Sequence, residues 1–187
     1  IPLESALYIH RASMEVQVDP AGLAEGMAQT GSPVPALIAA FGKAMEAPEY
    51  AKYIHHGARP QDIMDTALAL RLRQYIRLLD TRLESLINAD QFAGLAQARQ
   101  QLNAVQARLL IIRFKGEDGL LGDKSDTVAA AMAEALRLAN PGDLTISARA
   151  ANVELASAIV MITSSLAKIA QSVPETIHSE VLLTMAI

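Results

Sequence analysis

The sequence predicts an all-α protein, an elongated helical bundle with a small helical N-terminal cap region. Alanine and leucine dominate the chain, only 4% of residues are aromatic, and leucines recur every three or four residues over long stretches. Val and Ile rarely alternate with polar residues, so strands are not expected. With 187 residues, 51% of them hydrophobic, we expect one continuous domain: residues 1–61 as the cap region and polar turn, and residues 62–187 as the long-helix bundle.

Short helices are expected in the N-terminal third. Residues 3–14 form the first. Asp19 and Pro20 supply a capping residue and a first-turn proline for the second, which stops near Gly31. Pro33 and Pro35 interrupt the chain ahead of a third helix over residues 36–46, which Pro48 ends.

Two long helices are predicted next. From Ile63 to about residue 87, leucine and isoleucine recur at helical spacing, and arginines occupy the other faces. After Asn88 a second helix carries a narrow apolar stripe typical of paired long helices, at Leu95, Ala98, Leu102, Val105, Leu109 and Ile112. We expect the two helices to pack lengthwise.

Two more helices complete the prediction. Ser125 or Asp126 can cap a helix that stops at residues 140–142, which read NPG. The last long helix runs from about residue 147 to 173, where Pro174 breaks or kinks it before a short terminal helix. Its apolar run, residues 155–162, is too short to span a bilayer, so we expect a buried central helix and no membrane partner.

Composition bounds the functions that the chain can carry. The net charge of −4 argues against nucleic acid and anionic membranes as partners. A small anionic substrate stays compatible, because it requires only a local arginine pocket. The absence of cysteine excludes thiol chemistry in this chain and fits a cytoplasmic location, as does the lack of a secretory signal. A start at Ile1 without an initiator methionine predicts that the chain begins inside a longer gene product.

A polar turn lies directly before the first long helix. Residues 55–62 read HHGARPQD, in which Pro60 presets φ for a helix start and Asp62 places negative charge in the first turn. The unpaired N–H groups of a helix N-terminus favour an anionic ligand. We therefore treat His55, Arg59, Gln61 and Asp62 as candidate site residues.

Each candidate also has a purely structural interpretation. His55 has a pKa range suited to a catalytic base, or is a helix-end histidine bonded to backbone carbonyls. Arg59 could clamp a carboxylate through two parallel hydrogen bonds, or lie exposed in the loop beside Pro60, which has no N–H to donate. Gln61 is otherwise a solvated turn residue, and Asp62 a helix cap. The adjacent His56 would face another way, so the pair does not indicate a metal site.

The polar turn resembles the fumarase/aspartase superfamily, in the 3-carboxy-cis,cis-muconate cycloisomerase branch that borders adenylosuccinate lyase. The pattern of that branch reads His-Trp-Gly-Ala-Thr-Ser-Gln-Asp, followed by a helix that contains Asp-Thr-Ala-Leu, as residues 65–68 do. Other segments look like the branch in the same order, at residues 19–25, 31–37, 121–124, 128–130 and 166–171. The resemblance places Lys124 and Arg149 on a lysine and an arginine of the family, although both could simply be solvated.

The resemblance implies a cofactor-free and metal-free lyase or cycloisomerase. Such an enzyme acts on a small polycarboxylate by acid–base anti-elimination or lactonisation. It assembles as a homo-tetramer that builds each site from several subunits. The long apolar stripes independently predict a homo-oligomer.

The chain departs from the family pattern. A second motif of the Thr-x-x-Gln or Thr-x-x-His type, expected between residues 87 and 104, is not found, nor is the mobile loop that carries the catalytic serine base. Arg59 and Pro60 replace a Thr-Ser pair, and residues 115–120 (KGEDGL) replace a glycine-rich turn. Two interpretations follow: an enzyme that is incomplete in this chain, or a catalytically inactive relative that serves as an assembly or regulatory subunit.

Overall fold

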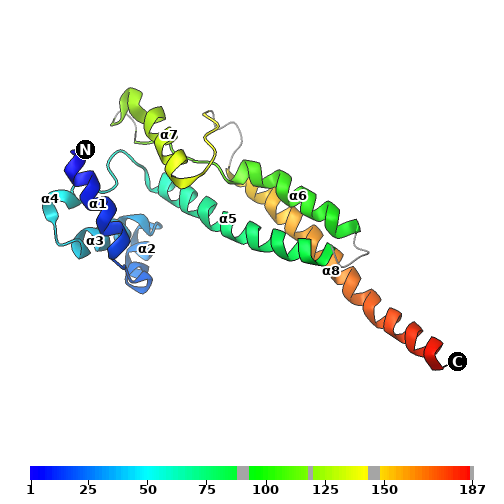
Figure 1. Cartoon of the computed structure of the whole chain (residues 1–187). Helices are drawn as coiled ribbons and strands as arrows, with labels where there is room; N and C mark the ends of the chain where they lie inside the picture. Colours follow the sequence, from blue (N-terminus) through cyan, green and yellow to red (C-terminus); the bar gives the residue numbers. More distant parts are fainter. Residues whose placement is uncertain (88–92, 118–119, 143–147, 186–187) are drawn as a thin grey trace. The chain divides into compact units, whose positions relative to one another are not determined.

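Eight α-helices and no strands make up the part of the chain that the structure describes (Figure 1). This computed structural model describes residues 1–87, 93–117, 120–142 and 148–185, without the side chains of residues 93, 148–149 and 172–185. The all-helical prediction is confirmed. The helices are α1 (Leu3–Glu15), α2 (Ala24–Thr30), α3 (Val34–Ala44), α4 (Pro48–Ala51), α5 (Pro60–Ile87), α6 (Ala93–Leu109), α7 (Ser125–Leu136) and α8 (Ala148–Met185).

The chain divides into two compact units. Unit 1 comprises residues 1–67 and 113–135, and unit 2 comprises residues 68–112 and 136–187. The division falls inside α5, so one helix contributes residues to both units. The sequence-based division at residue 61, within one continuous domain, stays a prediction.

The small helices of unit 1 follow local signals in the sequence. Asp19 accepts a hydrogen bond from the Ala21 N–H at 3.0 Å and starts a 3₁₀ turn, Pro20–Leu23, that leads into α2. Gly31 ends α2 in the left-handed conformation, with φ of 71°. The predicted second helix is thus confirmed, with a 3₁₀ first turn. The sequence analysis missed α4, which Pro48 begins as its first residue.

Aromatic contacts join α1 to α4 within unit 1. The ring centroids of Tyr8 and Tyr50 lie 4.5 Å apart. The Tyr8 hydroxyl donates to the Met45 carbonyl at 3.3 Å, and the Tyr50 hydroxyl donates to the Glu4 carboxylate at 3.0 Å. Each ring therefore packs on the other while its polar tip is satisfied.

Unit 2 is built on α5, α6 and α8, which lie side by side in Figure 1 and share one hydrophobic core. The predicted stripe is confirmed within α6, where Leu95, Ala98, Leu102, Val105 and Leu109 are buried. Ile112 is also buried but lies beyond the end of this helix. Ile76 and Leu83 from α5 pack into this core, together with Leu155 and Ile162 from α8. Ion pairs flank the core. The Arg99 guanidinium of α6 donates to the two carboxylate oxygens of Asp80 of α5, at 2.6 and 3.1 Å. Arg108 of α6 forms an ion pair with Glu154 of α8.

The last helix differs from its prediction in two respects. It continues past Pro174 to Met185, so the expected break is wrong. Proline removes one N–H donor from the helix ladder, and the other N–H groups of the helix are unaffected by that loss. The expected burial holds for one face only: Ala151 and Leu155 are buried, whereas Val153 and Val160 are 65% and 63% exposed.

A segment of α8, Ala150–Gln171, is long and apolar enough to cross a membrane by length and composition alone, with a mean hydropathy of 1.6. The sequence analysis judged only the shorter run inside it. A mostly buried core helix of a soluble protein passes the same test, whereas 17% of the most apolar window of this segment is buried. The expected lack of a membrane partner therefore stays a prediction.

Candidate functional site

The predicted polar turn forms the N-terminus of α5, which begins at Pro60. Arg59 stands at the capping position, and Asp62 is the third residue of the helix. The Asp62 carboxylate reaches back and accepts the Arg59 N–H at 3.0 Å. This is the side-chain half of a capping box, in which the third helical residue satisfies the N–H of the capping residue.

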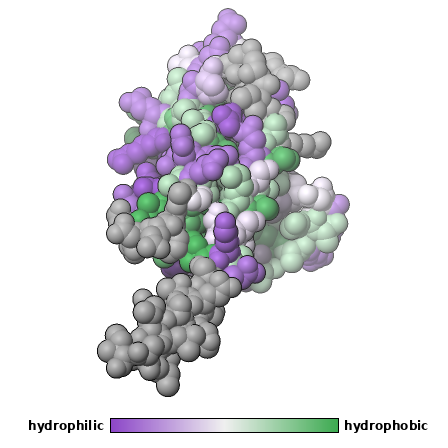
Figure 2. All heavy atoms as spheres, turned by 90° about the vertical axis from the view of Figure 1, so that its right-hand side faces the viewer, coloured by the Kyte–Doolittle hydropathy of each residue, from purple (hydrophilic) through white to green (hydrophobic). Residues whose placement is uncertain are grey.

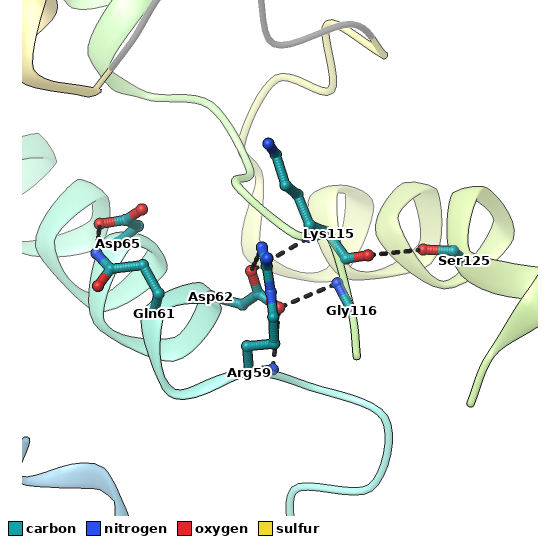
Figure 3. Close-up of polar contacts among 7 residues, drawn as sticks. All are labelled: Arg59, Gln61, Asp62, Asp65, Lys115, Gly116 and Ser125. Carbon is teal, nitrogen blue, oxygen red and sulfur yellow. Dashed lines mark hydrogen bonds and ion pairs between the residues drawn. The ribbon is translucent and has the colours of Figure 1, made fainter. Parts of the chain in front are cut away.

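Asp62 also binds a second segment of unit 1 (Figure 3). Its side chain is only 2% exposed, and it accepts the backbone N–H groups of Lys115 at 3.2 Å and Gly116 at 3.0 Å. The Arg59 guanidinium donates to the same carboxylate at 3.0 Å, while the Lys115 ammonium points away. One buried side chain therefore joins the polar turn to a loop more than fifty positions further along the chain.

Two glycines permit this close contact. The Gly57 carbonyl accepts the Glu117 N–H at 2.8 Å. Gly57 has φ of +75°, and a Cβ on it would lie 2.7 Å from the Leu121 side chain. Gly116 has φ of +70°, and a Cβ on it would lie 3.1 Å from the Gly57 carbonyl oxygen. Both positions require a residue without a side chain.

The charge on Asp62 is stabilised from within the protein. Burial by itself raises the pKa of this carboxyl, but the Arg59 side chain, the N–H groups of Arg59 and Lys115, and the Arg59 charge together lower the pKa below its ordinary value. The carboxylate is therefore ionised at neutral pH. Its negative charge offsets the positive charge of Arg59. The turn therefore attracts an anion less strongly than Arg59 alone would.

Gln61 turns away from this contact. Its side chain is exposed and donates to Asp65 of the same helix at 2.7 Å, one turn further on (Figure 3). This i,i+4 pair supports the helix locally.

His55 faces different surroundings from its neighbours in the turn. It has φ of 64°, in the left-handed region, and its ring lines a cavity of about 390 Å³. Its Nε2 atom is buried, without a hydrogen-bond partner in the part of the chain that the structure describes. The structural interpretation of His55 expected its ring to bond backbone carbonyls. No such bond of Nε2 is among the described interactions.

The remaining two candidates lie apart in the sequence. Lys124 ends a short 3₁₀ turn, Gly122–Lys124, with an exposed side chain, in unit 1. Arg149 stands in the first turn of α8, in unit 2, and its side chain lies outside the described residues. The structure thus brings Arg59 and Asp62 into contact, and the catalytic or binding roles assigned to all six candidates stay predictions.

Sequence reasoning missed the loop partners of Asp62. The signal was the pair of glycines at 116 and 119 in residues 115–120, which the sequence analysis treated only as the replacement of a family turn. Among the described residues, no group of three or more His, Asp or Glu side chains could hold a metal ion.

Known proteins share the sequence pattern and the fold of this chain. No family model matches the sequence. The chain is 32% identical to 3-carboxy-cis,cis-muconate cycloisomerase of Pseudomonas aeruginosa, over 96% of this chain and 47% of that protein. It superposes on the crystal structure of 3-carboxy-cis,cis-muconate lactonizing enzyme from Pseudomonas putida with a TM-score of 0.82 and 28% identity, over 92% of this chain and 48% of that one. A fumarate lyase from Mesorhizobium sp. BNC1 has the same fold, with a TM-score of 0.83 at 24% identity, over 95% of this chain and 50% of that one.

The all-helical fold, with a polar turn at the start of a long bundle helix, is that of the helical lyases and cycloisomerases. The chain belongs to the fumarase/aspartase superfamily and is related to 3-carboxy-cis,cis-muconate cycloisomerase over about half the length of those proteins. The sequence resemblance is confirmed at this level.

The alignment with the Pseudomonas aeruginosa protein contains positions that this chain does not fill. It extends over 217 positions with the Pseudomonas aeruginosa protein, more than the 187 residues of this chain. That relative therefore carries residues inside the matched span that have no counterpart here.

Proposed function

We propose that this chain is part of a lyase or cycloisomerase that acts on a small polycarboxylate without a cofactor. The observation that carries the proposal is the 32% identity to 3-carboxy-cis,cis-muconate cycloisomerase over 96% of the chain. The polar turn of residues 55–62, folded at the N-terminus of α5, supports it. Helix N-termini in general favour anions, and in this turn the Arg59 N–H is already donated to the Asp62 carboxylate.

The reaction would remove a proton beside a carboxylate and stabilise the resulting aci-carboxylate. The group on the neighbouring carbon is then expelled, or in the reverse direction a lactone closes. This chemistry needs a base and a clamp of hydrogen-bond donors. Arg59, Gln61 and Asp62 are the proposed substrate-binding residues of the turn, and His55 is the candidate base within this chain. Lys124 and Arg149 are further proposed substrate-binding residues. The proposal assigns the serine base to polypeptide outside this sequence.

A specific observation favours the second candidate, a catalytically inactive relative that serves as an assembly or regulatory subunit. The Asp62 carboxylate takes its donors from Arg59 and from the loop at Lys115 and Gly116, all within the chain. Such a turn has a full structural role without any substrate.

We also propose a homo-oligomer, a tetramer as the family resemblance implies. Val153 and Val160 are seven residues apart on α8 and therefore share one exposed face of that helix. Leu78 of α5 is 52% exposed as well. Figure 2 shows hydrophobic residues interspersed with hydrophilic ones on the face in view. Exposed apolar side chains on long helices suit helix-to-helix association between copies.

The two candidate functions can be separated with 3-carboxy-cis,cis-muconate, the tricarboxylate named by the relatives. Calorimetric titration measures its binding to the purified chain, and its ultraviolet absorbance follows turnover. Binding with turnover supports the enzyme. Binding without turnover supports a site whose base lies elsewhere, and absence of binding contradicts a substrate site in this chain.

The contribution of Arg59 is tested with Arg59→Ala. We expect weaker binding of the tricarboxylate, because a guanidinium is a strong carboxylate partner. The control is Arg11→Ala, an exposed arginine of the same unit that pairs with Glu15. Equal affinity for both variants would remove Arg59 from the clamp.

The intact mass of the protein purified from its natural source gives an independent answer. These 187 residues account for 20.0 kDa. A larger mass supports the enzyme, with additional segments that can carry the serine base. A mass of 20.0 kDa supports the inactive relative.

A further inference from the structure

Four hydrogen-bond donors of unit 1 converge on one carboxylate at the start of α5 (Figure 3). The turn supplies the N–H and the guanidinium of Arg59, and the loop supplies the N–H groups of Lys115 and Gly116. Each oxygen of Asp62 accepts one donor from the turn and one from the loop, at 3.0–3.2 Å. We call these four donors the cradle.

The cradle has the chemistry of a carboxylate site. Successive backbone N–H groups that include a left-handed residue form a concavity that binds anions, and Gly116 supplies that conformation with φ of +70°. A guanidinium also prefers carboxylates. An ionised carboxylate only accepts, so it can satisfy all four donors at once. A neutral amide cannot, because its nitrogen is itself a donor.

The loop meets the turn through this carboxylate. The Asp62 side chain is only 2% exposed, so the loop closes over it and shields it from water. The Glu117 N–H continues the contact by donating to the Gly57 carbonyl at 2.8 Å. A single methylene group links the carboxylate to α5, and it makes no hydrogen bond. The four donors therefore recognise the carboxylate itself rather than its attachment to the chain.

We propose that the docking of residues 115–117 on the polar turn is a carboxylate-dependent lock, in which the cradle closes on a carboxylate and Asp62 is the one that the chain supplies. The loop docks on a negative charge and is released when that charge is absent. A free carboxylate as small as formate can take the place of the Asp62 side chain once that side chain is removed. The proposal is independent of the proposed function, because it requires neither a polycarboxylate substrate nor turnover.

The test is chemical rescue in the whole chain. Asp62→Gly removes the side chain and leaves room for formate, and amide hydrogen exchange at Lys115 and Gly116, followed by NMR, reports the docking of the loop. In sodium chloride we expect fast exchange at both amides. Sodium formate at equal ionic strength should slow it about tenfold when the formate concentration is roughly ten times its dissociation constant. The wild-type chain, whose cradle is filled, should exchange equally in both salts.

Two further variants separate the lock from a general salt effect. Asp62→Asn fills the cradle without a charge, so exchange should be fast and formate should not slow it. Asp65→Gly places a glycine in the same helix at a residue that pairs with Gln61, and formate should have no effect on it. The proposal is overturned if formate leaves Asp62→Gly unchanged or slows exchange equally in Asp65→Gly. If Asp62→Gly is unfolded in chloride, formate should restore its folded spectrum, and a chain that is equally unfolded in both salts contradicts the lock.

Discussion

Arg59 and Asp62 hold each other in place at the start of α5. The Arg59 N–H and guanidinium both donate to the Asp62 carboxylate at 3.0 Å, one to each oxygen. The carboxylate is buried, whereas the guanidinium is 40% exposed. The contact therefore anchors the turn from its inner end and leaves the arginine at the edge of solvent.

Asp62→Ala should destabilise unit 1 by about 2–4 kcal/mol. The substitution leaves the N–H groups of Lys115 and Gly116 without their acceptor, and buried unsatisfied donors are costly. Amide hydrogen exchange at these two residues should accelerate, and the midpoint of thermal unfolding should fall. Asp65→Ala is the control. Among the described side chains, Asp65 is bound only by that of the exposed Gln61, so its substitution should cost about 0.5 kcal/mol or less. Equal losses in the two variants would contradict an anchoring role for Asp62.

Asp62 should also make stability depend on pH in acid. The folded pKa lies below the unfolded value of about 3.9, so the carboxylate stabilises the fold fully above the unfolded value. That contribution is lost as pH falls through the folded pKa. The Asp62→Asn variant lacks this charge-dependent stabilisation at every pH. The difference in unfolding free energy between wild type and variant should be constant above about pH 5 and shrink below about pH 4. A difference that stays constant down to pH 2 would show that Asp62 does not titrate with folding.

Gly57→Ala should destabilise unit 1 by about 1–3 kcal/mol. The new methyl group meets the Leu121 side chain at 2.7 Å, and φ of +75° disfavours any residue with a Cβ. Chemical unfolding measures the loss. Gly22→Ala is the control, because Gly22 has nothing within 4 Å of its built Cβ, and should change stability little. Adding Leu121→Ala to Gly57→Ala should recover part of the loss, whereas simple additivity would argue against the clash.

Leu102→Ala should destabilise unit 2 by about 2–5 kcal/mol, because Leu102 is fully buried where α5, α6 and α8 meet. Leu86→Ala removes a leucine that is 42% exposed and should cost clearly less. Urea unfolding followed by circular dichroism compares the two variants. Similar losses would mean that the α6 stripe is not the centre of the core.

The double variant Val153→Lys with Val160→Lys should dissociate the proposed oligomer. Charges on this exposed apolar face of α8 would face a second copy and oppose association. Light scattering coupled to size exclusion should then give 20.0 kDa, against four times that mass for the wild-type tetramer. Met14→Lys is the control, on an exposed methionine of unit 1. A wild-type mass of 20.0 kDa would refute the oligomer directly.

Helix positions and the α6 stripe could be predicted from the sequence because their causes are local. Asp19 and Gly31 start and stop the second helix through contacts within a few residues. The spacing of Leu95, Leu102 and Leu109 places them on one face whatever the partner helix is. The start of α5 at Pro60 follows from the fixed φ of proline for the same reason.

Tertiary structure decided what the candidate residues contact. Besides Arg59, the partners of Asp62 are the backbone N–H groups of Lys115 and Gly116, more than fifty positions away, and the glycine at 116 was their only hint in the sequence. The cavity beside His55 arises from helices that are separate in the sequence, and the lining face of α3 reads like any core face. The sequence alone therefore determined most of the helices and the superfamily resemblance, but not α4 or the passage of α8 through Pro174. The joining of turn and loop, the burial of Asp62 and the unsatisfied nitrogen of His55 depend on long-range packing, which local preference does not encode.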